Sequence, residues 1–542
     1  MERDFSDNTG VVPTSYFRFR LKHHHVPTMI FGANAMTDIL FGQSYYLRFD
    51  EKLWNAMQPY PPLGTLYAAS YMREQGYQVG LFDAMLAEST KDWHAFLCAH
   101  QPKYAVIFED NFNYLSKMSL LRMREAAFEM IDYAKQENCM VIVAGADMTD
   151  HAEKYLECGA DYILIGEGEE TLAELINYLE AADNVGNEVQ ESDLYQIRSL
   201  AYLNEGTVVK TPPRAVIRTL DEMPFPAWDL VNRDQYRDIW KEHHGYFSMN
   251  LVTTRGCPFH CNWCAKPIWG QKYNSRSPEN VVLEMKWLKE NFKPDHIWFM
   301  DDIMGIRDKW IEEFADLLDE HQAHIPFKSL NRADLLLRGN TIPALARAGA
   351  DIVWIGAESG SQKILDAMDK GTQVEQIYEA TKKAHEHGVK VAFFLQFGYP
   401  GESREDIELT LKMVRDLMPD DIGISVSYPL PGTPFYERVR GELGRENWYD
   451  SQDMAMLYQG PFHTEFYRQL HRIVHKDYRS RKTWGNLSSW MKSPQNLRGA
   501  HLKQIASMLY HRVTLPLAHR ELDKLALLPH EPTQISNIQI VG

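Results

Sequence analysis

The sequence predicts an α/β protein in which two parallel-sheet domains follow each other and a helical region completes the chain. Short apolar runs alternate with amphipathic segments over residues 28–182, and the same alternation returns over residues 248–440. Strands that alternate with amphipathic helices form parallel sheets with helices packed on their faces. In the second stretch, three closely spaced cysteines follow the first apolar run, which indicates where the chemistry takes place.

Length and charge limit the classes of protein to consider. A chain of 542 residues is too long for one core and predicts several domains. The first residues, 1–27, read as a polar leader, and no run of about 18 apolar residues predicts a membrane span. Six cysteines fit a reducing compartment, so we expect a cytoplasmic protein. A net charge of −17 argues against sequence-independent binding of nucleic acid, because such binding needs basic side chains to contact the phosphates.

The first alternation, residues 28–182, predicts a flavodoxin-like, doubly wound domain. Such domains bind ligands at the carboxyl ends of their strands. The predicted strands are Met29–Gly32, Tyr77–Phe82, Tyr104–Phe108, Met140–Ala144 and Tyr162–Ile165.

Small residues stand where these strands end and helices begin. Glycine at a strand end lets the backbone turn sharply or approach a ligand closely. Each of these turns is a weak signal by itself. The candidate ligand-contacting residues are Leu63, Gly64, Gly145, Gly166, Glu167 and Gly168.

Residues 183–247 read as a linker that contains a hairpin. The apolar runs Leu200–Leu203 and Thr207–Lys210 flank a short polar turn with a glycine. Thr211–Leu230 is proline-rich and is predicted to be extended.

The second alternation, residues 248–440, predicts six βα units that close toward a partial (β/α)6 TIM barrel. Functional residues of such barrels gather at the carboxyl ends of the strands. The predicted strands are Ser248–Thr253, His296–Met300, Phe327–Leu330, Asp351–Ile355, Val391–Phe397 and Ile422–Val426.

The cysteines Cys257, Cys261 and Cys264 have the spacing C-x3-C-x2-C. Soft thiolates select zinc, Cu(I) or iron–sulfur clusters. Zinc sites usually have four protein ligands, and no fourth cysteine or histidine pair stands at finger spacing. Three ligands therefore favour an iron–sulfur cluster with one open iron. The alternative is a structural metal site or three buried thiols.

The spacing, with Trp263 directly before the last cysteine, resembles the radical S-adenosylmethionine (SAM) proteins that carry a cobalamin-binding domain. That group includes the anaerobic magnesium-protoporphyrin monomethyl ester cyclase and radical SAM methyltransferases. The resemblance covers roughly residues 28–440 and rests also on FMDDIM, NRADLL, IGAESGSQKILDAMDKGT, FGYPGES and YPLPGTPFY.

The resemblance implies three cofactors: a 4Fe–4S cluster on the three cysteines, SAM on its open iron, and cobalamin on the N-terminal domain. It implies SAM contacts from Trp263, Arg332, Glu358, Ser359 and Gln396 and cobalamin contacts from the six residues named above. No side chain is singled out as catalytic. The family motif D-x-H-x-x-G, whose histidine binds cobalt, is missing from residues 1–180, so the axial cobalt ligand stays open.

The function implied is methylation of an unactivated carbon in a small-molecule, lipid-like or tetrapyrrole-like substrate. Cobalamin-assisted oxidative cyclisation or oxidation is the alternative within this class. Two alternatives come from other functional classes. One is an RNA-modifying enzyme like the methylthiotransferases, and the other is a non-catalytic corrinoid or SAM sensor. We expect a reducing partner such as flavodoxin or ferredoxin and no nucleic acid. The helical residues 441–542 are expected to form an accessory region.

Overall fold

The computed structural model describes residues 37–265, 268–492 and 499–529. The chain forms two compact units: Met1–Ile217 with Glu222–Asn250 and Asp450–Gln452, and Arg218–Asp221 with Leu251–Tyr449 and Asp453–Gly542. The predicted leader and the predicted strand Met29–Gly32 lie outside the described residues.

The first unit is built on a seven-stranded sheet of order β2-β1-β3-β4-β5-β6-β7. The first five strands pair in parallel, and β6 and β7 form a hairpin that extends the sheet in antiparallel pairing from β5. The order of the parallel strands is that of the predicted doubly wound domain. The strands are β1 (Ile39–Gly42), β2 (Val79–Leu81), β3 (Tyr104–Phe108), β4 (Met140–Ala144), β5 (Tyr162–Leu164), β6 (Leu200–Asn204) and β7 (Thr207–Lys210).

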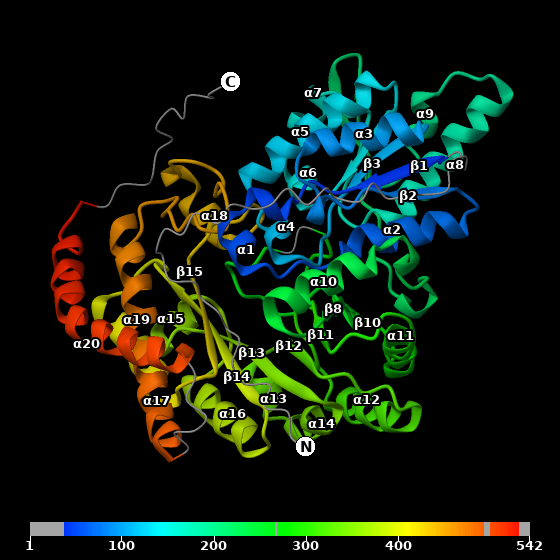
Figure 1. Cartoon of the computed structure of the whole chain (residues 1–542). Helices are drawn as coiled ribbons and strands as arrows, with labels where there is room; N and C mark the ends of the chain where they lie inside the picture. The colour runs from blue at the N-terminus through cyan, green and yellow to red at the C-terminus, as the bar shows by residue number, and fades with distance from the viewer. Residues whose placement is uncertain (1–36, 266–267, 493–498, 530–542) are drawn as a thin grey trace. The chain divides into compact units, whose positions relative to one another are not determined.

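Helices pack in two groups on this sheet. Helices α2 (Leu63–Glu74) and α8 (Glu169–Val185) pack together, and so do α3 (Thr90–His100) and α5 (Leu121–Gln136) (Figure 1). The other helices are α1 (Glu51–Ala56), α4 (Tyr114–Lys117), α6 (Ala146–Asp150), α7 (Ala152–Glu157), α9 (Glu191–Leu194) and α10 (Arg233–His244).

Helix α10 belongs to the first unit because its apolar face is buried against it. Trp240 is fully buried and donates a hydrogen bond of 2.7 Å to the carbonyl of Pro59. The Tyr236 hydroxyl donates one of 2.7 Å to Asp83. The segment that follows the hairpin therefore returns to the domain that precedes it.

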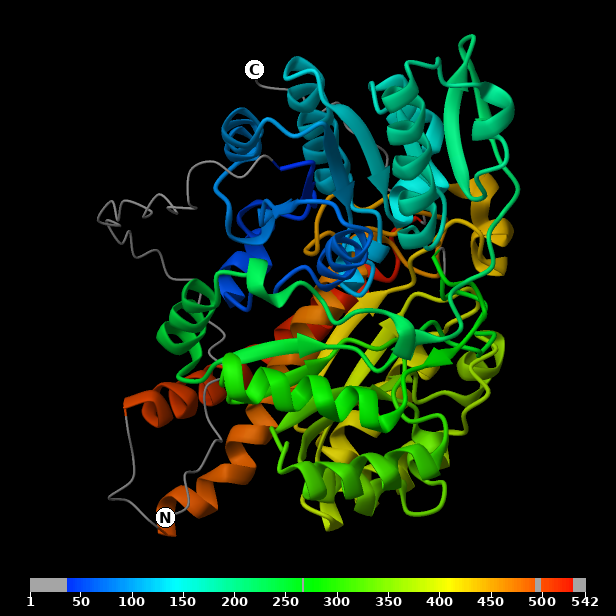
Figure 2. The same ribbon diagram turned by 90° about the vertical axis from the view of Figure 1, so that its right-hand side faces the viewer.

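The second unit holds most of a parallel half-barrel sheet of order β15-β14-β13-β12-β11-β8, as the sequence predicts (Figure 2). Residues on the helix-facing side of its strands are fully buried, for example Phe299, Phe327 and Phe393. The strands are β8 (Ser248–Leu251), β11 (His296–Phe299), β12 (Phe327–Asn331), β13 (Ala350–Glu358), β14 (Lys390–Phe397) and β15 (Asp421–Val426).

All helices of the half-barrel except α18, which follows β15, lie between consecutive strands of this sheet. The helices are α11 (Pro278–Asn291), α12 (Asp308–His321), α13 (Ala333–Leu336), α14 (Thr341–Ala348), α15 (Gln362–Ala367), α16 (Val374–Glu386), α17 (Arg404–Leu417) and α18 (Pro434–Val439). A short ribbon of β9 (Thr254–Arg255) and β10 (Asn274–Ser275) stands beside the sheet.

Two long helices, α19 (Thr464–Lys492) and α20 (Gly499–Leu525), follow and pack against each other (Figure 1). Helix α19 also contacts α17. The region expected to be helical, residues 441–542, is helical over α19 and α20, whereas its residues 443–463 are irregular. In the part of the chain that the structure describes, no helix is long and apolar enough to cross a membrane.

Candidate cofactor sites

The three cysteines stand on a loop that the β9–β10 ribbon closes at its base. Arg255 pairs with Asn274 and Thr254 with Ser275. Gly256, directly before Cys257, has a φ of +80°, and a Cβ there would lie 2.3 Å from the carbonyl oxygen of Lys272. Only glycine fits this turn, so the backbone fixes where the cysteine loop begins.

A buried carboxylate holds the entry to this loop. Asp301 accepts hydrogen bonds from the backbone N–H groups of Thr253 and Thr254 at 2.7 and 2.8 Å and from both hydroxyls at 2.8 and 3.0 Å. Burial raises the pKa of Asp301 to about 6. Four donors satisfy this side chain, so its role is to anchor the loop.

Asn262, between two of the cysteines, anchors the middle of the loop. Its amide donates to Ala367 O at 2.9 Å and to Asp369 at 2.8 Å, and its oxygen accepts from the Tyr399 hydroxyl at 2.7 Å. The side chain is only 4% exposed, so these bonds form away from water.

The three thiols are half-buried, and none of them is in a disulfide with another described cysteine. Arg332, at the end of β12, places Nη1 3.9 Å from the Cys261 sulfur and its guanidinium 3.8 Å above the Phe259 ring. Nε and Nη2 of Arg332 donate to Asp334 and Thr372, both at 3.0 Å. Three soft donors beside a fixed cation suit an anionic iron–sulfur cluster, so the residues present fit the group that the spacing predicts.

Glu358, at the end of β13, pairs with a lysine that the sequence did not single out. Lys370 donates to Glu358 Oε1 at 2.7 Å and lies 5.9 Å above the Trp263 ring. Burial lowers the pKa of Lys370, but the neighbouring Glu358 and Cys261 more than offset it, and the net shift is upward. The Trp263 indole N–H is buried without a hydrogen-bond partner among the described residues. It is available to a ligand.

The other two predicted SAM contacts are engaged within the protein. The Ser359 hydroxyl is fully buried and bonds to Thr410 Oγ1 at 3.1 Å. Gln396 donates to Ser427 at 3.0 Å. The geometry thus brings Trp263, Arg332 and Glu358 to the cysteine loop and gives Ser359 and Gln396 internal partners.

In the first unit, the chain order reverses between the adjacent strands β1 and β3. Ligands of open α/β sheets bind at such a switch point. Buried polar atoms without a hydrogen-bond partner among the described residues gather after these two strands. They belong to Gln43, Tyr45, Tyr46, Glu109, Asn111 and Ser116. Unpaired buried polar groups are costly and rare, and the amide-bearing side arms of a corrin would supply partners, so this cluster fits cobalamin.

Glu109 is the charged member of this switch-point cluster. Its Oε1 accepts from the Ser44 N–H at 2.9 Å, and Oε2 has no partner among the described residues. Burial raises the pKa of Glu109 to about 7. A Cβ on Gly145 would lie 2.7 Å from Glu109 Cγ, so the predicted glycine at the end of β4 makes room for this carboxyl.

Leu63 and Gly64 lie beside the same strand end. The Gly64 N–H donates to Asp110 at 3.0 Å, and a Cβ on Gly64 would lie 3.1 Å from the Asn111 nitrogen. Leu63 is fully buried at the start of α2. These two predicted residues and Gly145 therefore surround the switch-point cluster.

Gly166, Glu167 and Gly168, after β5, have local roles in the structure. Gly166 has a φ of +75°, and Glu167 accepts a hydrogen bond of 2.5 Å from the Ile217 N–H. A Cβ on Gly168 would lie 2.9 Å from the Phe108 ring. They shape the turn into α8 and hold the following linker.

Asp147 on α6 and His151 directly after this helix have the residue types of the motif D-x-H-x-x-G but not its spacing. Arg124 donates to both carboxylate oxygens of Asp147, at 2.7 and 2.5 Å, and the Tyr155 hydroxyl donates at 2.5 Å. His151 Nε2 lies 3.7 Å from the same carboxylate. Asp147 is therefore committed to a buried ion pair.

Comparisons with known proteins identify a domain family for each unit. Residues 251–414 match the Radical SAM superfamily, and residues 54–176 match the B12 binding domain. The chain is 27% identical to an uncharacterized methyltransferase, PH0819, of Pyrococcus horikoshii, over 70% of this chain and 78% of that protein. It is 24% identical to an anaerobic magnesium-protoporphyrin IX monomethyl ester cyclase of Synechocystis sp., over 76% and 81%.

Among solved structures, the cobalamin-dependent SAM radical enzyme OxsB with aqua-cobalamin has a similar fold. The TM-score is 0.65 at 19% identity, over 90% of this chain and 72% of that one. The protein is a radical SAM enzyme. More narrowly, it belongs to the cobalamin-dependent radical SAM enzymes, and its cofactors are a 4Fe–4S cluster, SAM and cobalamin.

Proposed function

We propose that this enzyme transfers a methyl group from SAM to an unactivated carbon of a small molecule, with lipid-like and tetrapyrrole-like compounds as the first substrates to test. The observation that carries the proposal is the switch-point cluster of unpartnered buried polar groups on the chain that also holds the three-cysteine loop. A corrinoid bound there would supply the methyl carrier. The iron–sulfur cluster on the three cysteines, together with SAM, would supply a carbon-centred radical.

The residues of the chain would act by binding and orientation. We assign Cys257, Cys261 and Cys264 to the cluster and Arg332, whose planar fork suits a carboxylate, to the SAM carboxylate. Trp263, Glu358, Ser359 and Gln396 are proposed as further SAM contacts, the last two through the backbone because their side chains have internal partners.

For cobalamin we propose the switch-point cluster with Leu63, Gly64 and Gly145 around it. With a pKa of about 7, Glu109 is partly protonated near neutral pH and can donate a hydrogen bond to a corrin amide oxygen. We also propose that the turn after β5, formed by Gly166, Glu167 and Gly168, contributes to the edge of the cobalamin site.

The test is a product analysis under anaerobic conditions with cluster-reconstituted protein, hydroxocobalamin, SAM and a reductant. A methyltransferase forms both S-adenosylhomocysteine and 5′-deoxyadenosine, and the S-adenosylhomocysteine depends on bound corrinoid. Cys261→Ala should abolish formation of 5′-deoxyadenosine, whereas Cys158→Ala, at a half-buried cysteine of the other unit, should leave it unchanged. 5′-Deoxyadenosine without S-adenosylhomocysteine would contradict methyl transfer.

Oxidative cyclisation is the second candidate because the chain aligns with the Synechocystis cyclase over 81% of that protein. It predicts 5′-deoxyadenosine and no label transfer from methyl-labelled SAM. Both candidates need an electron donor, for which we propose flavodoxin or ferredoxin.

A further inference from the structure

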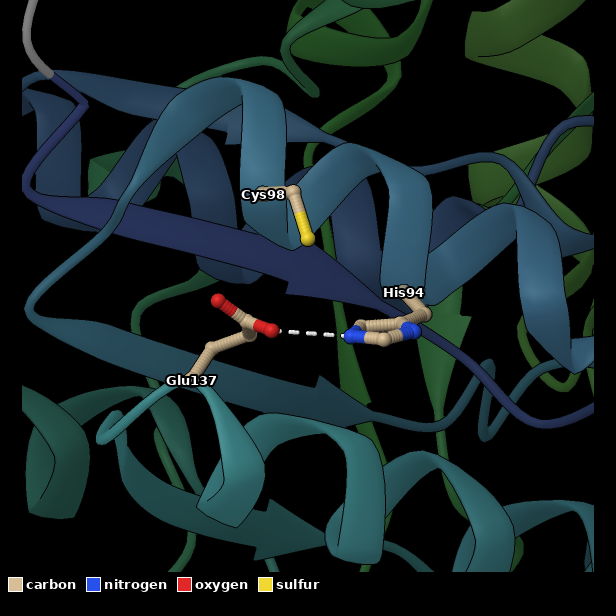
Figure 3. Close-up of side chains that lie close together, drawn as sticks. All are labelled: His94, Cys98 and Glu137. Carbon is tan, nitrogen blue, oxygen red and sulfur yellow. Dashed lines mark hydrogen bonds and ion pairs between the residues drawn. The ribbon is translucent and has the colours of Figure 1, made fainter.

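A group of three metal-ligating side chains lies on the first unit, away from the residues assigned to either cofactor. His94 and Cys98 stand one turn apart on α3, so they share a helix face. Glu137 caps the end of α5, which packs against α3. One ligand atom from each of the three lies within 4.8 Å of the others, and Figure 3 shows the side chains pointing toward one another.

The geometry of this group is held by contacts outside it. The His94 ring stacks on Tyr133 of α5, with ring centres 4.6 Å apart and planes 11° apart. Ser89, the N-cap residue of α3, forms a capping box with Asp92 that fixes the start of the helix. Trp93 is fully buried and donates a hydrogen bond of 3.0 Å to Met130 O on α5. The two helices are therefore fixed in register beneath the three side chains.

The three side chains are also accessible. Cys98 is exposed, and the side chains of His94 and Glu137 are 33% and 34% exposed. His94 Nε2 and Glu137 Oε1 are 2.8 Å apart and form a hydrogen bond (Figure 3). An ion can reach the group from solvent without moving the backbone.

We infer that His94, Cys98 and Glu137 form a binding site for a divalent metal ion of the zinc class. Zinc takes imidazole nitrogen, thiolate sulfur and carboxylate oxygen at about 2.0–2.3 Å, which places neighbouring ligand atoms about 3.5 Å apart. Small side-chain rotations bring the three ligand atoms, which now lie within 4.8 Å of one another, to that spacing. The thiol proton leaves to solvent, the His94 ring binds through Nε2 as the neutral tautomer with its proton on Nδ1, and water completes a four-coordinate ion.

Such an ion would tie α3 to α5 at the surface of the cobalamin-binding unit. It is independent of the radical chemistry because none of its ligands belongs to the cysteine loop or to the switch-point cluster. Tyr133 acts as a positioning residue because its ring orients the His94 imidazole.

The test uses the full-length protein with its iron–sulfur cluster reconstituted, titrated with zinc against a chelating indicator of known affinity. We expect one more zinc ion per chain than in Cys98→Ser or His94→Ala. Loss of a residue that only orients a metal ligand typically weakens metal binding about 10- to 100-fold, so loss of a ligand itself should weaken zinc binding at least as much. Cys158→Ser, at the half-buried cysteine of the same unit, is the matched control and should keep the site.

Zinc X-ray absorption on the loaded protein gives a second readout. One sulfur and two or three nitrogen or oxygen neighbours, with the sulfur lost in Cys98→Ser, would support the site. Equal zinc uptake by the wild type and Cys98→Ser would overturn it. So would a zinc environment of three sulfurs, which would place the metal on the cysteine loop instead.

Discussion

Lys370 Nζ donates a hydrogen bond of 2.7 Å to Glu358 Oε1, and both side chains are more than nine-tenths buried. Glu358 has a φ of +56°, a left-handed conformation that costs a non-glycine residue about 1–3 kcal/mol. A Cβ on Gly356 would lie 2.7 Å from both partner atoms. The ion pair and this glycine together hold the strained end of β13 next to the cysteine loop.

Replacing Lys370 with methionine should destabilise the protein strongly. It leaves the Glu358 carboxylate buried without its partner, which costs about 3–5 kcal/mol. The measurement is the free energy of unfolding in urea. Lys412→Met is the control, since Lys412 is 64% exposed and its pair with Asp416 belongs to a class that contributes at most about 1 kcal/mol. Equal losses in the two variants would contradict the role assigned to the buried pair.

Replacing Gly145 with alanine should impair cobalamin binding. The new Cβ would lie 2.7 Å from Glu109 Cγ, and displacing that side chain costs about 1–3 kcal/mol. We expect less corrinoid to remain on the protein after desalting. Gly441→Ala, at a glycine with no atom within 4 Å of the added Cβ, should retain the wild-type amount.

The strands of the half-barrel were predictable because each is an apolar run with a clear end. The first strand of the other unit was not predicted. The run Ile39–Gly42 is short and closely resembles Met29–Gly32 in composition. Its pairing with both Val79 and Tyr104 identifies it as β1, and pairing is a tertiary property.

The same distinction separates the predicted from the unpredicted site residues. The cysteine spacing is local and could be read directly. Gln43 and Glu109 come together only because β1 and β3 are neighbours, although the run Glu109-Asp110-Asn111 directly after a buried strand is a signal that sequence reasoning could have used. Lys370 was not predicted because its contact with Glu358 depends on the fold of the segment between them.

Glu109 should make stability depend on pH. Burial raises its pKa from 4.5 to about 7, so between these values the folded state binds more protons than the unfolded state. Stability is therefore lost as pH rises through this window, by roughly 3 kcal/mol for this group. Glu109→Gln cannot ionise and should lack this contribution.

The measurement is the difference in free energy of unfolding between the wild type and Glu109→Gln, in urea, from pH 4.5 to 8. The comparison is needed because burial also raises the pKa values of Asp83, Asp110 and Asp301 to about 6. The wild type should lose stability relative to the variant as pH rises. Glu153→Gln, at an exposed glutamate, should show no such trend.

Replacing Arg332 with lysine tests the assignment of the SAM carboxylate. Lysine keeps the charge and loses the planar fork, which now spans Asp334, Thr372 and the Phe259 ring. We expect the dissociation constant for SAM to rise about 10- to 100-fold, or about 1.4–2.7 kcal/mol, while iron content stays constant. Equilibrium dialysis of the reconstituted protein measures this. Arg338→Lys is the matched control because Arg338 lies 3.9 Å from the same Asp334 and is 53% exposed. If both variants bind SAM like the wild type, Arg332 serves the fold of the loop and another cation binds the carboxylate.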